Sequence, residues 1–403
     1  MSRIRSLSRA RLTILVVALA GLAVTAAVAS AALGGGETPP PRPLAEAVQR
    51  AVTAPPPAGV SARIEFANRL LPAGALPEGE APPLLAGASG RLWARPDGRM
   101  RLELQSRRGD AQVASDGRAL TLYDASSKTV YRAEMPKGEK SESRRGEDRR
   151  RPPTLAEIER KLARLSERAR LSGARPESRA GRPAYSVRVA PRNDGGLLGA
   201  AEIAWDAVRG VPLRAAVYAK GETEPVLDLS VTDVSYDAVP LSDVAVEPPV
   251  GTRVVRVDSP GEEGDERSRG KKDRKRVTGL AAVRKALPFG LAAPEKLASL
   301  PRREVRLIAH EGRPGALVIY GRGLAAIAVI EQPAQRSEPR DERGGGREDV
   351  LRELPEISVD GAKGTKLATA LGTLIRFERD GVAYAVAGSV PPATAEAAAR
   401  ELR

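Results

Sequence analysis

Alternating apolar and polar residues run through the chain from Ser61 to about Pro136. A strand that buries one face places every second side chain on that face, so strict alternation predicts antiparallel strands with one apolar and one polar side. The runs Pro96-Asp97-Gly98 and Asp116-Gly117 supply turns between these strands. The apolar members of the alternating strands are Ile64, Phe66, Leu92, Met100, Leu102, Leu104, Leu120 and Leu122.

The stretch from Thr154 to Leu171 has helical spacing instead. Thr154 and Glu157 form a capping-box pair, which is typical of a helix start. Charged residues lie opposite the apolar ones, so the pattern predicts an amphipathic helix. Packing of this helix on the sheet and a role as a movable plug both stay open. Its apolar residues are Leu155, Ile158, Leu162 and Leu165.

Further elements lie on both sides of this helix. A short helix is predicted from Leu44 to Thr53, and Pro55–Pro57 ends it. The order strand, helix, strand predicts an α+β fold built on one curved antiparallel sheet. The later strands of that sheet are predicted at Ala184–Ala190, Ala200–Trp205, Val211–Ala219 and Val226–Tyr236.

Charged tracts divide the chain into two predicted domains, residues 44–250 and residues 277–403. Lys137–Pro153 has no aliphatic residue and is predicted to be a solvated insertion in the first domain. Asp258–Arg276 is equally charged, and we interpret it as the linker between the domains. A third charged, Gly-rich stretch, from about Pro333 to Asp349, is predicted to be a loop of the second domain.

The second domain is predicted to be smaller and also α+β. Leu280, Val283 and Leu287 indicate a short helix, and Gly321-Arg322-Gly323 indicates a hairpin turn. A helix from about Thr394 to Leu402 ends the chain. The strands are predicted near Glu304–Ile308, Ala316–Tyr320, Leu324–Glu331, Glu356–Val359, Gly372–Glu378 and Val382–Gly388.

The amino terminus, residues 1–36, has the pattern of an export signal. Arginines at positions 3, 5, 9 and 11 precede an uncharged run of 22 residues from Leu12 to Leu33. A run of this length can span a bilayer, and small residues near Ala29 also fit a cleavage site. Cleavage and retention as a membrane anchor both stay open. In either case the rest of the chain lies outside the cytoplasm, which argues against a nucleic-acid partner.

The composition narrows the chemistry. Among 403 residues there is no cysteine and one histidine, His310, which excludes disulfides, thiolate metal sites and schemes that need two imidazoles. The chain has no G-x-S-x-G nucleophile motif, and Gly344–Gly346 lacks the Lys-Ser/Thr of a phosphate loop. We therefore expect a protein that is not an enzyme and that binds no cofactor and no metal.

The charge balance is basic, with 65 Lys and Arg against 51 Asp and Glu and a net charge of +14. The excess is spread along the chain and is not gathered on one helix. It is consistent with a solvated surface, and it would also draw an exported protein to anionic lipid headgroups. A membrane surface is therefore a candidate partner.

Two short stretches of the first domain resemble the outer-membrane lipoprotein carrier family, LolA, and its relatives. These are Gly90-Arg-Leu-Trp-Ala-Arg-Pro-Asp-Gly-Arg-Met-Arg-Leu-Glu-Leu104 and Ser115-Asp-Gly-Arg-Ala-Leu-Thr-Leu-Tyr-Asp124, which Lys128–Arg132 continues. In the second domain, the stretch from Thr373 to Gly388, followed by Pro391 and Pro392, resembles the small domain of RseB-type (MucB/RseB) sigma-factor regulators. The pairing of the two halves is more specific than either half alone.

This resemblance implies a half-open antiparallel β-barrel with helices, followed by a smaller α+β domain. It also implies that the concave apolar face holds acyl chains of a lipid or a lipoprotein, and the alternative is an RseB-like envelope-stress sensor that binds an anti-sigma factor. The chain departs from the family in its long charged loops, its low aromatic content and its lack of cysteine. The lipid-binding residues expected on this basis are Ile64, Phe66, Leu92, Met100, Leu102, Leu104, Leu120, Leu122, Leu155, Ile158 and Leu162.

Overall fold

The computed structural model describes residues 38–71, 87–106, 109–124, 128–134, 153–192, 196–245, 251–257, 277–310, 313–334 and 354–403. The predicted export segment lies outside these residues, as does the predicted linker. Nearly all of the predicted insertion 137–153 and of the loop 333–349 lies outside them as well. The predicted domain boundaries at these segments therefore stay predictions.

Within the described ranges, thirteen strands form a first sheet, in the spatial order β13-β6-β5-β4-β3-β2-β1-β12-β11-β10-β9-β7, with β8 also paired to β9. All neighbours run antiparallel except β13, which pairs in parallel with β6. The strands are β1 (Val60–Asn68), β2 (Ala88–Ala94), β3 (Arg99–Ser106), β4 (Gly109–Asp116), β5 (Ala119–Asp124), β6 (Thr129–Glu134), β7 (Ala169–Leu171), β8 (Arg175–Arg179), β9 (Arg182–Pro191), β10 (Leu198–Asp206), β11 (Pro212–Ala219), β12 (Leu227–Ser235) and β13 (Arg253–Val257).

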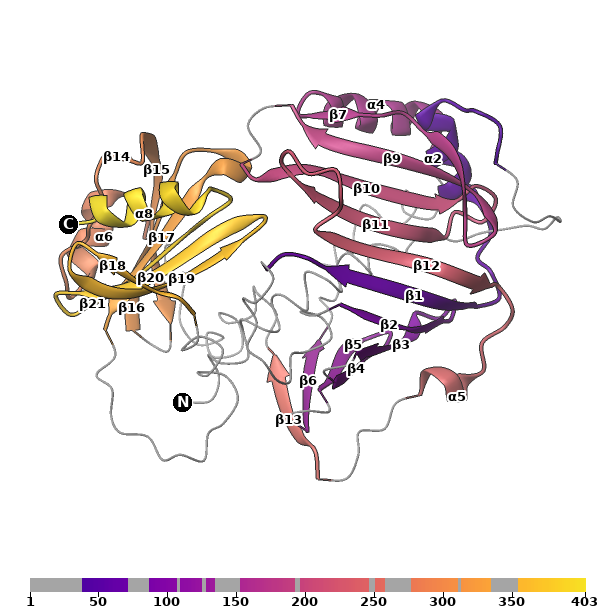
Figure 1. Ribbon diagram of the computed structural model, residues 1–403, viewed down its shortest axis with the longest axis horizontal. Helices are drawn as coiled ribbons and strands as arrows, with labels where there is room; N and C mark the ends of the chain where they lie inside the picture. Colours follow the sequence, from indigo (N-terminus) through magenta and orange to yellow (C-terminus); the bar gives the residue numbers. More distant parts are fainter. Residues whose placement is uncertain are drawn as a thin grey trace, which may run out of the picture.

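The first sheet curls into a half-barrel. Figure 1 shows β9 to β12 on one side, β1 at the bend, and β2 to β6 turning back beneath them. The predicted architecture of a half-open, mainly antiparallel barrel with helices is thus confirmed. Strand β13 carries the first sheet on to Val257, past the predicted domain end at residue 250.

Three helices accompany the first sheet in the described part of the chain: α2 (Leu44–Thr53), α4 (Leu155–Ser166) and α5 (Leu241–Val244). Helix α2 has the predicted bounds, and its Ala47 and Ala51 pack against Tyr185 of β9 and Trp205 of β10. A β-carbon on Gly210, in the β10–β11 turn, would lie 2.3 Å from the carbonyl oxygen of Ala51. Only glycine fits there, because the helix backbone rests directly on that turn.

Helix α4 begins with the predicted capping box. The Thr154 backbone amide donates to the Glu157 carboxylate at 2.8 Å, and the Glu157 amide donates to the Thr154 hydroxyl at 3.3 Å. The predicted end at Leu171 is wrong, because α4 stops at Ser166 and residues 169–171 form β7 instead. Pairing with β9 satisfies the backbone of β7, and Ala169 is buried there.

A second sheet follows, with eight strands among the described residues in the order β14-β15-β16-β17-β21-β20-β19-β18. The predicted strand at Leu324–Glu331 begins too early, because residues 323–325 form a 3₁₀ turn and Leu324 is exposed. The strands are β14 (Lys296–Leu297), β15 (Leu300–His310), β16 (Arg313–Tyr320), β17 (Ile327–Pro333), β18 (Glu356–Val359), β19 (Ala362–Thr369), β20 (Gly372–Arg379) and β21 (Val382–Gly388).

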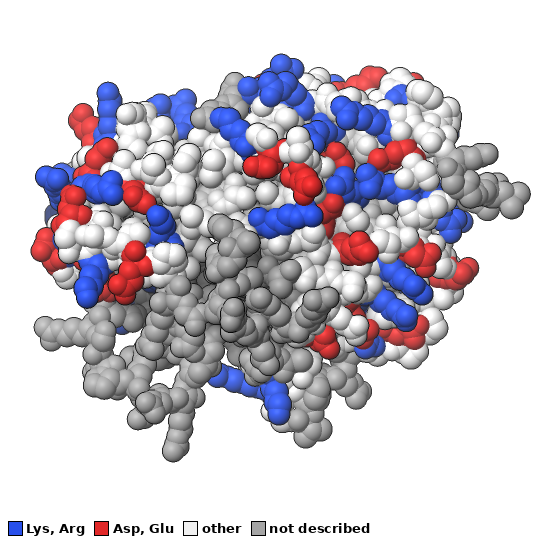
Figure 2. All heavy atoms as spheres, in the orientation of Figure 1, with Lys and Arg blue, Asp and Glu red and all other residues white. Residues whose placement is uncertain are grey.

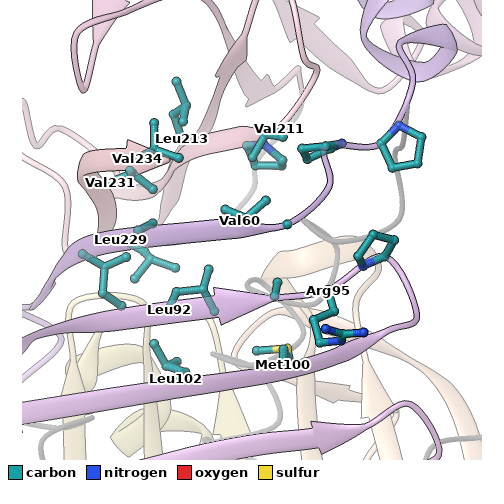
Figure 3. A pocket seen from close by; sticks show the side chains of 18 of the residues that line it. Val60, Leu92, Arg95, Met100, Leu102, Val211, Leu213, Leu229, Val231 and Val234 are labelled. Carbon is teal, nitrogen blue, oxygen red and sulfur yellow. The ribbon is translucent and has the colours of Figure 1, made fainter. Parts of the chain in front are cut away.

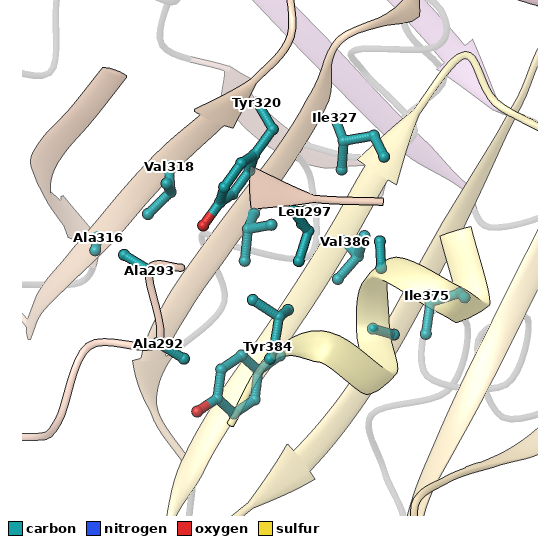
Figure 4. Packing of buried hydrophobic residues seen from close by; sticks show 14 of the residues in the cluster. Ala292, Ala293, Leu297, Ala316, Val318, Tyr320, Ile327, Ile375, Tyr384 and Val386 are labelled. Atoms are coloured by element: carbon teal, nitrogen blue, oxygen red, sulfur yellow. The ribbon is translucent and has the colours of Figure 1, made fainter. Parts of the chain in front are cut away.

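Helices α6 (Leu280–Ala286) and α8 (Pro392–Glu401) cover one face of the second sheet. Figure 4 shows Ile375 and Val386 of the sheet beside α8. Three alanines of α8, at positions 395, 398 and 399, are fully buried, so the helix backbone approaches the strands closely. The predicted smaller α+β unit is therefore built around a compact core of its own.

Hydrogen bonds join the described parts of the two sheets at two points. The amide of Leu197, before β10, donates to the carbonyl of Ser389 at 3.1 Å and to its hydroxyl at 3.0 Å. The amide of Ala370, in the β19–β20 turn, donates to the carbonyl of Leu70 at 2.8 Å. The second sheet is thus held against the ends of β1 and β10 of the first.

One carboxyl group is enclosed in the core of the second sheet. Glu331 of β17 is fully buried, and its Oε2 atom accepts a hydrogen bond from the Ala292 amide at 2.9 Å. Its Oε1 atom and the buried hydroxyl of Tyr320 have no partner among the described residues. Burial raises the pKa of Glu331 to about 7, although the Ala292 amide acts in the opposite direction.

This burial makes the stability of the second sheet depend on pH. Folded Glu331 keeps its proton up to about pH 7, while an ordinary glutamate loses it near 4.5. The unfolded state therefore binds fewer protons between these values, and the free energy of unfolding falls as pH rises through that window, by about 3 kcal/mol in all. The free energy of unfolding is measured by urea titration at about pH 5 and at about pH 8. We expect the difference between the two values to disappear in Glu331→Gln.

Glu304→Gln on β15 is the matched control, because the Glu304 side chain is 42% exposed. The control should follow the wild-type pH dependence. Parallel curves for wild type and Glu331→Gln would show that the buried carboxyl group does not stay protonated in the folded protein.

Candidate functional site

An apolar cavity of about 440 Å³ opens on the inner side of the half-barrel. Residues of β1, β2 and β3 line one part of it, and residues of β11 and β12 line another (Figure 3). The segment after α2, from Pro56 to Gly59, contributes to its rim. The volume falls within the range of ~300–1,000 Å³ that small-molecule pockets usually have.

Strand register explains why the wall is apolar. Cross-strand pairing aligns Ala62 of β1 with Leu92 of β2, and Leu92 with Leu102 of β3. The neighbouring row aligns Val60, Ala94 and Met100 in the same way. Because every second residue of a strand points to the same face, these rows stack into a continuous aliphatic surface.

The opposite wall comes from strands far away in the sequence. Strand β12 pairs with β1 and aligns Val234 with Ala62 and Val231 with Ile64. Leu229 of β12 aligns with Ala215 of β11, and both residues line the cavity. The curl of the sheet brings these side chains over the cavity wall of β1 to β3.

The rim of the cavity is closely packed against the segment before α5. A β-carbon on Gly59 would lie 2.5 Å from the carbonyl oxygen of Asp237 and 2.7 Å from a methyl group of Val239. The guanidinium of Arg95, which lines the cavity, donates to the carbonyl of Val239. These contacts fix the rim beside the β2–β3 turn.

That turn carries the charges nearest to the cavity. Arg95 donates through Nε to the Asp97 carboxylate at 3.1 Å, and the backbone amide of Arg99 donates to the same carboxylate at 3.1 Å. The bond from the Arg99 amide, together with Arg95 and Arg99, holds the pKa of Asp97 below its usual value. Gly98 follows with φ of +85°, which a side chain would disfavour.

A third charged residue of the lining, Arg214 of β11, is fully engaged elsewhere. It alternates with the buried Leu213 and donates bidentately to Asp228, at 2.8 Å and 2.6 Å. A second carboxylate, from Glu202, binds its Nη1 atom. The hydrogen bonds that Arg214 donates to Asp228 raise the pKa of Arg214 further, so this group stays charged, and the carboxylates neutralise it in the sheet.

The structure brings four of the predicted site residues together at the cavity: Ile64, Leu92, Met100 and Leu102. Phe66 and Leu104 are buried in the same apolar cluster, and Leu120 and Leu122 pack against it, but these four do not line the cavity. Leu155, Ile158 and Leu162 lie on α4, which packs against α2 and β7, and they are not among the lining residues either.

Sequence reasoning missed most of the second wall and the charged rim. Leu229 and Val231 belong to the predicted strand Val226–Tyr236, where they alternate with Ser230, so their apolar face could have been included. Leu213 stands in the predicted strand Val211–Ala219. Arg95 carries no local signal, because only the register of β1, β2 and the turn places it at the cavity.

The described residues contain no group of three or more His, Cys, Asp or Glu that could hold a metal ion. None of the helices in the described part of the chain has the length and apolar character needed to cross a membrane. The described lining of the cavity is aliphatic apart from Arg95, Asp97, Arg214 and the prolines and glycines of its rim.

The sequence matches no family model and no curated protein. Among solved structures, the chain is similar to MucB in complex with MucA(peri), at 15% identity and a TM-score of 0.40, over 89% of this chain and 98% of that one. The Pseudomonas aeruginosa MucA/MucB complex gives 17% identity and a TM-score of 0.39, over 88% of this chain and 96% of that one. A LolA superfamily protein from Nitrosomonas europaea gives 10% identity and a TM-score of 0.22, over 51% of this chain and 98% of that one.

The buried charges around Arg214 give a test of the wall that carries Leu213. Arg214→Met would leave the partly buried carboxylates of Glu202 and Asp228, whose side chains are only 14% and 19% exposed, without this cation. Loss of one partner from a buried ion pair costs about 3–5 kcal/mol. We expect a decrease of that order in the free energy of unfolding, measured by urea titration.

Arg132→Met is the control on the same sheet. Arg132 pairs with Asp116 at 3.1 Å, but the two side chains are 45% and 50% exposed. Exposed pairs contribute about 0–1 kcal/mol, so this variant should unfold almost as the wild type does. Equal effects of the two substitutions would contradict the enclosed network.

Proposed function

We propose that the chain is an extracytoplasmic binding protein without catalytic activity, and that it holds an acyl chain of a lipid or lipoprotein in the cavity of the half-barrel. One observation carries this proposal: a cavity of about 440 Å³ whose walls are aliphatic along five strands, with its free charges confined to one turn. A surface of this kind recognises length and apolarity and offers little to a polar substrate.

The energetics of such binding are favourable without directional contacts. Each methylene removed from water contributes roughly 0.8 kcal/mol, so burial of about twelve methylenes gives roughly 10 kcal/mol before the entropic cost of binding. Leu92 and Val231 are only partly buried within the protein, so a ligand would remove further apolar surface from water. The same physics allows release, because no covalent or metal bond is involved.

Export is part of the proposal. It is supported by the basic flank and the apolar run of residues 1–36, which lie outside the described residues. A net charge of +14 would draw the protein to anionic lipid headgroups, so the proposal includes a membrane surface as the place of ligand exchange. Figure 2 shows basic and acidic side chains interspersed over the visible face, so attraction would be diffuse and would not come from one patch.

The alternative, an envelope-stress sensor that binds an anti-sigma factor, stays a prediction of the resemblance. The complex with MucA(peri) has been observed for MucB, not for this chain. The alternative requires a polypeptide partner whether or not a lipid occupies the cavity. A protein that binds no lipid at all but captures the periplasmic part of an anti-sigma factor would favour it.

Leu102→Asp tests the cavity. Leu102 is buried on β3 and lines the cavity, where water can reach a new carboxylate if the ligand leaves. We expect the variant to stay folded by circular dichroism but to bind a dansylated undecanoic acid at least tenfold more weakly than the wild type, because a charge in an apolar site must be desolvated when the chain enters.

Leu104→Asp is the matched comparison, two residues further along the same face of β3. Leu104 is 2% exposed and packs in the cluster outside the cavity, so its carboxylate would be enclosed by protein and should unfold the sheet. Ala215→Leu fills the cavity without adding charge and should also weaken binding. Folded Leu102→Asp and Ala215→Leu variants that bind the probe like the wild type would contradict the proposed site.

The location has its own test. The reporter is an enzyme that is active only in the cytoplasm, and it is fused after Gly36. We expect an inactive product, because the positive flank Arg3–Arg11 stays on the cytoplasmic side and the chain that follows crosses the membrane. A fusion in which the four flanking arginines are replaced by glutamate is the control and should regain activity. Full activity of the unmodified fusion would place the chain in the cytoplasm.

A further inference from the structure

Apart from Arg214, which Glu202 and Asp228 neutralise, the charged residues of the described lining lie at one end of the cavity. Its lining residues Arg95, Asp97 and Gly98 all belong to the β2–β3 turn, next to the row of Val60, Ala94 and Met100. The rows that follow along the strands are aliphatic, through Leu92 and Leu102 to Ile64. A ligand that fills the cavity therefore has an apolar environment along its length and a charged one at a single end.

Arg95 is the cation that remains available at this end. Its Nε and Nη1 atoms bind Asp97 and the carbonyl of Val239, which fixes the guanidinium in place. Within the described ranges its Nη2 atom has no hydrogen-bond partner, and the side chain is 28% exposed. Figure 3 shows Arg95 beside Met100 at the edge of the cavity. A guanidinium has five N–H donors, so donors stay open for an acceptor on the ligand.

The charges of the turn do not cancel. Asp97 is the single acid of the segment from Arg95 to Arg99, and it faces two arginines, with Arg99 at 3.9 Å from its carboxylate. The lowered pKa of Asp97 keeps that carboxylate ionised, so the segment keeps one net positive charge. Arg214, the other cation of the lining, is neutralised by Glu202 and Asp228 and cannot serve.

We propose that the ligand is a single-chain amphiphile with an anionic headgroup, a carboxylate or a phosphate, and that Arg95 binds this headgroup while the chain lies along the aliphatic rows. This inference rests on the proposed lipid-binding function and names its ligand class. Arg95 acts as a specificity-determining residue, because an uncharged amphiphile of the same chain would gain the same apolar burial but would leave the guanidinium donors without an anionic acceptor.

The test compares headgroups on one chain. Binding of myristate, lysophosphatidic acid with a myristoyl chain, and monomyristoylglycerol is measured by displacement of a fluorescent probe from the purified, exported protein. The wild type should bind both anionic compounds about ten- to a hundredfold more tightly than the uncharged one, since a charge-assisted hydrogen bond contributes roughly that factor. The carboxylate and phosphate compounds show which headgroup is preferred.

Three variants separate charge from structure. Arg95→Gln should lose the preference for anionic compounds while its affinity for monomyristoylglycerol changes less than about threefold. Arg95→Lys should retain most of the preference, because it keeps the charge. Arg91→Gln, an exposed residue that alternates with Leu92 on β2 and is not among the lining residues, should behave as the wild type.

The outcomes distinguish this inference from the proposed function. Equal affinity of the wild type for charged and uncharged compounds would overturn the role of Arg95 and leave the lipid site standing. Equal weakening of all three compounds by Arg95→Gln would also overturn it, since the residue would then act only by holding Val239. Failure of the wild type to bind any of the three compounds would overturn the proposed function itself.

Discussion

Burial of one apolar face along a curled sheet governs the first half of the molecule. Strands β1 to β3 align their aliphatic side chains in rows, and the pairing of β1 with β12 continues those rows onto a second wall. The curl turns the two walls toward each other, but α2 covers only the end near Tyr185 and Trp205. The apolar face that remains uncovered becomes the cavity, so sheet curvature and the position of one short helix together create the site.

Charge is arranged around this face so that it does not interrupt it. Arg214 lies between Leu213, which is buried, and Ala215 of β11, yet its guanidinium is held by two carboxylates of neighbouring strands and adds no free charge to the wall. Asp206 is similarly enclosed, where it accepts hydrogen bonds from the Tyr236 hydroxyl and from two backbone amides. Among the described residues that line the cavity, only the β2–β3 turn provides a cation that is not neutralised, because a turn at the edge can be solvated while a strand interior cannot.

The sequence was informative wherever the signal is local. Prolines on both sides fix helix α2, a capping box fixes the start of α4, and alternation fixes β1, β3 and β5, so the fold class and the wall with Ile64, Met100 and Leu102 could be predicted. The end of α4 could not, because Ala169–Leu171 can continue a helix and become a strand only through pairing with β9. For the same reason, the spacing of Leu155, Ile158 and Leu162 predicts an apolar helix face but not what that face contacts. The pairing of β1 with β12 could not be predicted either, because it joins residues about 170 positions apart.

The two sheets cover their apolar faces to different degrees, which explains why the cavity lies in the first sheet. The second sheet buries its face under α8, whose alanines 395, 398 and 399 let the helix backbone approach until Val318, Ile327 and Ile375 are fully enclosed. In the first sheet the corresponding cover comes from a loop at Pro56–Gly59 and from α2, which meet only part of the face. A closely packed core has no room for a ligand, whereas a ligand can cover and stabilise an apolar face that the protein covers only in part. The proposed ligand site thus follows from an incompletely covered apolar face, and the contacts of Leu197 with Ser389 and of Ala370 with Leu70 join the first sheet to the closely packed second one.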